Sequence, residues 1–143
     1  MIPWRRIDHV GIAVRDLDAA IARWRDALGF EVGGREVLPE EGVEVAFLKI
    51  GESRLELVAP LPGNTTLARF LEKRGEGVHH LCFAVEGVAE RLRELEAAGA
   101  ELIDKAPRPG SHGTQVAFLH PRGQSGVLVE LVEDGPLSGP DHP

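Results

Sequence analysis

The chain has 143 residues, of which 43% are hydrophobic and 27% are charged, as is ordinary for a globular protein. The net charge is −7 and the basic residues are scattered, so neither a nucleic acid nor an anionic membrane is an expected partner. No apolar run approaches the ~18 residues that would span a bilayer, and the arginines near the N-terminus lack the apolar region of a signal peptide. The lone Cys82 excludes an internal disulfide and indicates a cytoplasmic location.

The first half of the chain predicts one helix and four strands. The expected elements are a strand at 7–14, a helix at 19–28, and strands at 30–38, 43–50 and 54–59. An N-cap signal at 16–18 precedes the helix, and Gly29 follows it as a C-cap. The order is therefore strand, helix, and three strands.

The second half predicts the same order after a connector. The expected elements are a strand at 78–85, a helix at 87–98, and strands at 100–103, 114–119 and 127–132. The connector at 60–77 contains breakers and a short helix over 67–73, and a loop rich in Pro and Gly fills 104–113. The tail from Gly135, with three prolines, is expected to be loose.

The two halves also repeat one another in sequence. The stretch IDHVGIAV at 7–14 returns as VHHLCFAV at 78–85, which makes His9 and His80 equivalent at an offset of 71 residues. Each half then closes on a Glu inside an apolar strand, Glu56 and Glu130, at an offset of 74. A fixed period with matched polar positions indicates an internal duplication.

The duplication predicts an α+β fold built from two pseudo-symmetric βαβββ modules, about 5–61 and 76–133, within a single domain over 1–143. Their curved sheets are expected to surround one cavity. His9 and His80 share a strand face with small residues, because side chains two apart point the same way. This arrangement leaves room beside each His for a bound group.

A metal site follows from the four matched polar residues. A buried carboxylate without a partner costs several kcal/mol, so Glu56 and Glu130 need a cation if they face inward. One divalent ion bound by His9, Glu56, His80 and Glu130 satisfies all four. Two imidazoles and two carboxylates suit Co²⁺, Mn²⁺, Ni²⁺, Zn²⁺ or Fe²⁺, with one or two positions left for water or substrate.

The remaining polar candidates are assigned lesser roles. His79 points to the opposite face from His80, and the other histidines lie in loops or the tail. Cys82 is interpreted as a small packing residue. Glu44 corresponds to Gln115 and is a candidate to reach the cavity, although a plain surface role is open. No phosphate-binding loop, CxxC motif or Gly-x-Ser-x-Gly elbow is present.

With these features the sequence resembles the vicinal-oxygen-chelate superfamily, which has a glyoxalase-like fold, and within it the methylmalonyl-CoA epimerase family. The stretches that carry the resemblance are IDHVGIAV, ELVAPL, GVHHLCFAV, HGTQVAFLHP and GVLVEL, which spread over nearly the whole chain. By this resemblance His9, His80 and Glu130 fall on the family's metal ligands. Glu56 falls where many epimerases carry Gln, and Glu at this position is also the glyoxalase I pattern.

The resemblance implies the interconversion of (R)- and (S)-methylmalonyl-CoA through an enolate, with Co²⁺ as the expected ion and a homodimer as the expected assembly. An epimerase needs a base on each face of the reacting carbon, so Glu130, Glu56 and, as a second choice, Glu44 are the candidate catalytic residues. Candidate contacts for the CoA phosphates are Arg5, Arg6, Lys73, Arg74, Lys105, Arg108 and Arg122.

Three alternatives remain open at this stage. Lactoylglutathione lyase (glyoxalase I) uses the same two His and two Glu for a proton shift. A ring-cleaving dioxygenase needs only one carboxylate, so the fourth ligand disfavours it. A metal-free protein that sequesters a drug would not need four ligands at matched positions, and the 5% aromatic content without Tyr weakens it further.

Overall fold

The computed structural model describes residues 2–134, which group into two compact units. One unit comprises His9–His79, and the other comprises the described residues among 1–8 and 80–143. Each unit is described by itself. No helix among the described residues is long and apolar enough to cross a membrane. The tail expected to be loose, with His142, lies outside the described residues.

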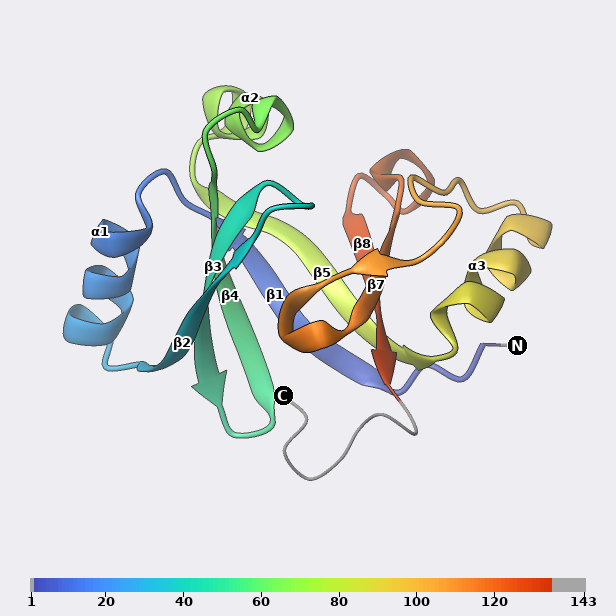
Figure 1. Ribbon diagram of the computed structural model, residues 1–143, viewed down its shortest axis with the longest axis horizontal. Coiled ribbons are helices and arrows are strands. Elements are labelled where there is room, and N and C mark those ends of the chain that lie inside the picture. Colours follow the sequence, from blue (N-terminus) through green and yellow to red (C-terminus); the bar gives the residue numbers. More distant parts are fainter. Residues whose placement is uncertain (1, 135–143) are drawn as a thin grey trace. The chain divides into compact units, whose positions relative to one another are not determined.

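The unit His9–His79 is built on four neighbouring strands, the first of which begins just before it. Its strands are β1 (Arg6–Ala13), β2 (Glu31–Leu38), β3 (Val43–Ile50) and β4 (Ser53–Pro60), in the order β2-β3-β4-β1 (Figure 1). β1 runs parallel to β4, and the other neighbours are antiparallel. The helix α1 (Leu17–Ala22) follows β1 and continues as a π-helical segment over Arg23–Ala27. The predicted N-cap is confirmed, because the Asp16 carboxylate accepts the Ala19 N–H at 3.1 Å.

The connector carries α2 (Thr65–Arg74), which belongs to the same unit. The side chain of Asn64 caps this helix by accepting the Leu67 N–H at 3.0 Å. Its amide donates to the Gly42 carbonyl at 2.9 Å, so one residue joins the helix to the turn before β3. Leu67 and Leu71 of α2 pack on the sheet face that carries Ala13. The predicted short helix is confirmed and is slightly longer than expected.

The other unit repeats the same layout. Its strands are β5 (Gly77–Glu86), β6 (Arg108–Pro109), β7 (Gln115–Leu119) and β8 (Leu128–Asp134), in the order β5-β8-β7-β6 (Figure 1). β5 runs parallel to β8, as β1 does to β4. Its helix is α3 (Val88–Ala97), and two short 3₁₀ turns cover Ser111–Gly113 and Pro121–Gly123. The βαβββ order predicted for both halves is confirmed.

The apolar cores between helix and sheet are also duplicated residue by residue. In the first unit the buried residues that pack together include Val14, Leu17, Ile21, Ala46, Leu48 and Leu57. In the second unit they include Val85, Val88, Leu92, Ala117, Leu119 and Leu131. The first five pairs differ by 71 residues and the last by 74, the offsets of the sequence repeat. The repeat therefore preserves the packing of the core as well as the polar positions.

The strand predicted at 100–103 is wrong. Only Leu102 forms an isolated bridge, to Leu119, and the short strand that pairs with β7 lies at Arg108–Pro109 instead. The cause is Asp104, whose carboxylate accepts the Phe118 N–H at 2.8 Å. The Asp104 side chain thus occupies a backbone N–H that a neighbouring β-strand would otherwise bond through its carbonyl group. The segment between α3 and β7 therefore forms only the two-residue strand β6, whereas the equivalent segment of the first unit forms the eight-residue strand β2.

The start of α3 depends on a carboxylate from β8. Gly87 has φ 70° and offers no side-chain cap, and instead Glu133 accepts the N–H groups of Gly87 and Val88 at 2.7 and 2.8 Å. Orphan N–H groups at a helix start favour a negative partner. We expect Glu133→Ala to lower the free energy of unfolding by about 1–2 kcal/mol, measured by urea denaturation. Glu31→Ala on exposed β2 is the control, and an equal loss in both variants would contradict the capping role.

Candidate functional site

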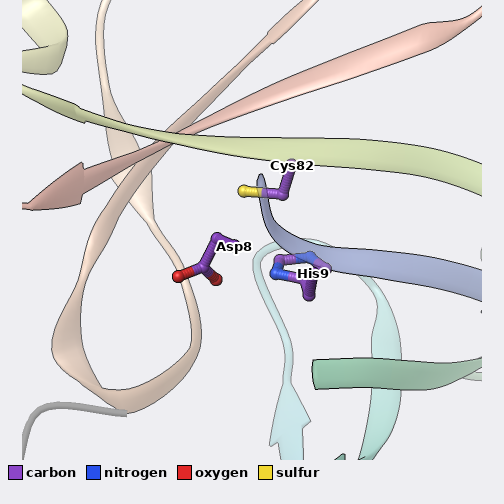
Figure 2. Close-up of side chains that lie close together, drawn as sticks. All are labelled: Asp8, His9 and Cys82. Carbon is purple, nitrogen blue, oxygen red and sulfur yellow. The ribbon is translucent and has the colours of Figure 1, made fainter. Parts of the chain in front are cut away.

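The first unit holds a buried His–Glu pair on the sheet face opposite α1. His9 on β1 and Glu56 on β4 are each 5% exposed, and His9 Nδ1 lies 3.1 Å from Glu56 Oε2. Figure 2 shows the imidazole of His9. The strand register produces this contact, because Glu56 is paired with Gly11, two residues after His9 on β1. Gly11 has no side chain, so Glu56 can reach the histidine diagonally.

The second unit holds the equivalent pair. His80 on β5 and Glu130 on β8 are 6% and 5% exposed, and His80 Nε2 lies 3.2 Å from Glu130 Oε1. Here Glu130 is paired with Cys82, which again follows its histidine by two residues. The structure therefore brings together the predicted ligands as two pairs, one within each unit.

Each glutamate is flanked by a phenylalanine on its other side. Phe47 of β3 is paired with Glu56, and Phe118 of β7 is paired with Glu130. The two phenylalanines differ by 71 residues, so they also belong to the repeat. The Phe118 ring meets the His80 ring edge-on with centroids 5.9 Å apart. Apolar rings beside each pair lower the local polarity, which strengthens the attraction of a carboxylate for a cation.

The donor atoms within each pair fit a metal ion. Two ligands that are each about 2.1 Å from an ion lie about 3.0–3.4 Å apart in octahedral or tetrahedral geometry. The nitrogen–oxygen separations of 3.1 and 3.2 Å fall in this interval. Imidazole nitrogen with carboxylate oxygen suits a borderline divalent ion. Each unit can thus supply two ligands.

The sequence reasoning missed an arginine beside the first pair. Arg54 is 9% exposed, and its Nη2 lies 3.5 Å from Glu56 Oε2. Its guanidinium also lies over the Phe47 ring, 5.7 Å from the centroid. The spacing of two residues along β4, which places Arg54 and Glu56 on one face, was the signal that could have identified it. In the other unit Arg108 lies over Phe118 at 5.1 Å.

The structure does not bring Glu44 to the face that carries the first pair. On β3, Phe47 is the partner of Glu56, and Glu44 is three residues from Phe47, so it points to the opposite side. Its neighbours Ala46 and Leu48 on that side pack in the α1 core. The Glu44 carboxylate accepts a hydrogen bond from Arg35 at 3.2 Å. Its predicted role as a base therefore finds no support in the position of its side chain.

This position gives a prediction for Glu44. If the reaction that the sequence resemblance implies is correct, we expect Glu44→Gln to keep turnover within about twofold of the unchanged protein, because this side chain does not reach the face of the His–Glu pair. Surface substitutions of this kind also change the free energy of unfolding by only about 0.5 kcal/mol. Steady-state kinetics on methylmalonyl-CoA would test it. A hundredfold loss of kcat, with normal folding by circular dichroism, would restore Glu44 as a base.

The other polar candidates have structural contacts. The His79 ring stacks edge-on against Phe70 at 4.8 Å. His120 accepts the Arg122 N–H at 3.0 Å and caps a 3₁₀ turn. His112 is exposed and adopts φ 56°, in the left-handed region.

Two further side chains are drawn in Figure 2. Cys82 is fully buried and packs with Ala84, Val116 and Val132, as its interpretation as a packing residue predicts. Asp8 is 5% exposed and pairs with Arg6 at 3.0 Å. Cys82 therefore contributes to the apolar packing of its unit, and Asp8 contributes a buried ion pair.

Most of the basic residues considered for CoA phosphates are already paired with acidic or aromatic groups. Arg5 pairs with Glu86, Arg6 with Asp134 and Asp8, Lys105 with Glu96, Arg108 with Asp104, and Arg122 with Glu101. Arg74 lies over the Phe70 ring at 5.6 Å. Lys73 is exposed in the last turn of α2. A phosphate would have to exchange with a carboxylate at most of these positions.

Comparison with known proteins assigns the family. Residues 8–118 match the model of the Glyoxalase/Bleomycin resistance protein/Dioxygenase superfamily. The chain is 43% identical over 128 residues to an ethylmalonyl-CoA/methylmalonyl-CoA epimerase of Cereibacter sphaeroides, covering 88% of this chain and 96% of the relative.

Two solved structures of similar proteins support the same family assignment. A Streptomyces coelicolor methylmalonyl-CoA epimerase in complex with 2-nitronate-propionyl-CoA is 39% identical with a TM-score of 0.89, covering 96% of this chain and all of that one. A methylmalonyl-CoA epimerase in complex with methylmalonyl-CoA and NH₄⁺ is 40% identical with the same TM-score and the same coverage. The predicted glyoxalase-like α+β fold is confirmed. The chain belongs to the glyoxalase/bleomycin resistance protein/dioxygenase superfamily and, within it, to the methylmalonyl-CoA epimerases.

Proposed function

We propose that the chain is a methylmalonyl-CoA epimerase in which His9, Glu56, His80 and Glu130 bind one divalent metal ion. The observation that carries the proposal is the duplicated His–Glu pair, buried in both units with ligand-like separations of 3.1 and 3.2 Å. Relatives at about 40% identity over most of the chain bear the epimerase name. The single domain over 1–143, with the two modules around one cavity, is part of this proposal.

The substrate chemistry suits this donor set. Methylmalonyl-CoA carries a thioester carbonyl and a carboxylate on the same carbon, so two of its oxygens can chelate one ion. When bound, the ion acts as a Lewis acid toward the negative charge that develops on the carbonyl oxygen. His9 and His80 would supply nitrogen donors from the two first strands, and Phe47 and Phe118 flank the carboxylates.

The two glutamates supply the proton transfers. A carboxylate oxygen of Glu130 or Glu56 takes the α-proton, and the electron pair of the broken C–H bond passes into the enolate of the substrate. The other glutamate, present as the protonated acid at this stage, delivers its proton to the opposite face, which restores the C–H bond and inverts the centre. The two side chains therefore exchange protonation states in each turnover. Each carboxylate must come within hydrogen-bond range of the reacting carbon's proton. Their equivalent places in the repeat make them the pair proposed for the two faces.

Three finer assignments belong to the same proposal. Co²⁺ is the proposed ion, because nitrogen and carboxylate ligands suit a borderline divalent metal, with Mn²⁺, Ni²⁺, Zn²⁺ and Fe²⁺ as substitutes. The proposed assembly is a homodimer and the proposed location the cytoplasm, where the lone Cys82 would stay reduced. The proposed partner is the acyl-CoA substrate, with no nucleic acid or membrane.

A substrate panel tests the reaction class. The metal-loaded protein is incubated with (2S)-methylmalonyl-CoA, with (2S)-ethylmalonyl-CoA, and with the hemithioacetal of methylglyoxal and glutathione. The proposal expects epimerisation of the first substrate, with the second reporting tolerance of a longer side chain. Turnover of the hemithioacetal alone would assign the chain to glyoxalase I chemistry, for which Glu56 is the sequence argument. Tight ligand binding without turnover or metal would indicate a sequestering protein.

A further inference from the structure

An arginine from β6 lies on the sheet face that carries the His80–Glu130 pair. Glu130 on β8 is paired with Phe118 on β7. Arg108 on β6 is paired with Val116, which precedes Phe118 by two residues on the same strand. Side chains that are paired across two strands, or that lie two residues apart along one strand, point to the same face of a sheet. Arg108 therefore shares its face with the proposed metal ligands of the second unit.

Two contacts fix the guanidinium of Arg108. Its central carbon lies 5.1 Å from the centroid of the Phe118 ring, and that ring meets the His80 ring at 5.9 Å. Its Nε lies 3.4 Å from Asp104 Oδ2, the same oxygen that accepts the Phe118 N–H. The guanidinium carbon therefore lies no farther from the His80 ring than the sum of the two ring distances.

The outer nitrogens of this guanidinium remain for a further partner. Nε is buried, and it faces Asp104 at a distance that is long for a hydrogen bond. Among the described residues of this unit, Nη1 and Nη2 donate no hydrogen bond. The Arg108 side chain is 36% exposed, so a ligand can reach it. Two neighbouring N–H groups of a guanidinium match the two oxygens of a carboxylate.

The arginine beside the first pair is placed differently. Arg54 also lies over a phenylalanine, but its side chain is only 10% exposed. Its Nη2 lies 3.5 Å from Glu56 Oε2, so an outer nitrogen of this cation already faces a carboxylate of the protein. Arg108 approaches its own carboxylate, Asp104, through Nε instead. Of the two arginines, Arg108 is therefore the one whose outer nitrogens can receive an anion from solution.

We propose that Arg108 binds the carboxylate of the substrate and is the residue that selects a carboxylated acyl-CoA over a simple one. This inference rests on the proposed function, in which the substrate is a CoA thioester with a carboxylate on its α-carbon. A carboxylate has two oxygens, so one can bind the ion held by His80 and Glu130 while the other accepts N–H groups from Arg108. The phosphates of CoA are separated from the thioester by the whole pantetheine arm, whereas Arg108 is joined to His80 through one ring.

The contact has a consequence for the reaction as well as for binding. A guanidinium held between a ring and a carboxylate has few orientations, so the anion that it binds also takes a defined orientation. Holding the substrate's carboxylate fixes the bond that joins it to the α-carbon. The two faces of that carbon are then presented in a constant way to the proposed bases, and proximity of this kind contributes to rate.

The test compares two ligands that share CoA and differ in the carboxylate. Binding of methylmalonyl-CoA and of propionyl-CoA to the Co²⁺-loaded protein is measured by isothermal titration calorimetry. We expect Arg108→Gln to weaken the binding of methylmalonyl-CoA at least about 10-fold and to leave that of propionyl-CoA within about twofold. Arg93→Gln, which removes an exposed arginine from α3 in the same unit, is the matched control and should leave both affinities unchanged.

A second variant keeps the test decisive if Arg108→Gln does not fold. Arg108→Lys retains the positive charge but lacks the paired N–H groups of a guanidinium. We expect it to weaken methylmalonyl-CoA binding by at least about threefold with propionyl-CoA unaffected. Unaltered affinity for methylmalonyl-CoA in this variant would contradict the proposed contact.

The remaining outcomes separate this inference from the proposed function. Equal weakening of both ligands by Arg108→Gln would mean that the residue contacts the CoA moiety, and it would refute the role in carboxylate selection. Unchanged binding of both ligands, in a background where the unchanged protein epimerises methylmalonyl-CoA, would refute this inference alone. An unchanged protein that neither binds nor epimerises methylmalonyl-CoA would refute the proposed function and the inference together.

Discussion

Replacing Glu130 with Gln is expected to lower kcat for epimerisation by at least about 10³-fold. A positioned general base contributes about 10²–10⁴-fold, and this glutamate is also proposed to hold the metal ion. It is 5% exposed, lies 3.2 Å from His80, and is flanked by Phe118, so the amide would face the same apolar surroundings without a charge. The change is nearly isosteric, and its effect should therefore be chemical more than structural.

The controls for Glu130→Gln separate these causes. Glu86→Gln, at the exposed end of β5, removes a carboxylate from the same unit and should keep full turnover. Metal content is measured on both proteins after dialysis against Co²⁺. Glu130→Gln with near-normal kcat and a full complement of metal would contradict both roles assigned to this residue.

Loading the protein with Co²⁺ is expected to produce the second large effect, a rise in thermal stability. A ligand that binds only the folded state adds about 2.7 kcal/mol to the free energy of unfolding when present at 100 times its Kd. Without the ion, two buried carboxylates beside two imidazoles depend on internal partners, so the metal-free protein should unfold earlier. Differential scanning calorimetry on EDTA-treated and Co²⁺-loaded protein measures the difference in Tm.

The ligand variants specify which residues produce this rise in Tm. His9→Ala and His80→Ala each remove one nitrogen donor, one from each unit, and both should reduce the shift caused by Co²⁺. If His9→Ala removes the shift and His80→Ala does not, the ion is held by the first unit alone. That outcome would contradict a single site shared by the four residues.

The repeat explains why much of the site could be predicted from the sequence. A duplicated His and a duplicated Glu at offsets of 71 and 74 require the same strand register in both halves, and the structure has it. The pairs His9–Glu56 and His80–Glu130 follow from that register alone, because the glutamate lies opposite the residue two positions after the histidine. The α+β class and the βαβββ order came from the same repetition.

What could not be predicted depends on contacts between side chains and distant backbone. The Asp104 carboxylate accepts a hydrogen bond from the Phe118 N–H, and this bond prevents a strand at 100–103. Nothing in the sequence near Asp104 predicts that hydrogen bond. Glu133 caps a helix that begins 45 residues earlier. The face on which Glu44 lies could not be predicted, because it depends on the register of β3 with β4, in which Phe47 and not Glu44 is paired with Glu56.

The most direct test of the central proposal is proton exchange at the substrate's α-carbon. Metal-loaded protein is incubated with (2S)-methylmalonyl-CoA in D₂O, and α-deuteration and epimer composition are followed by NMR and chiral analysis, with EDTA-stripped protein as control. The proposal predicts metal-dependent deuteration together with conversion to the (2R) form. A metal-loaded protein that neither deuterates nor inverts this substrate would contradict it.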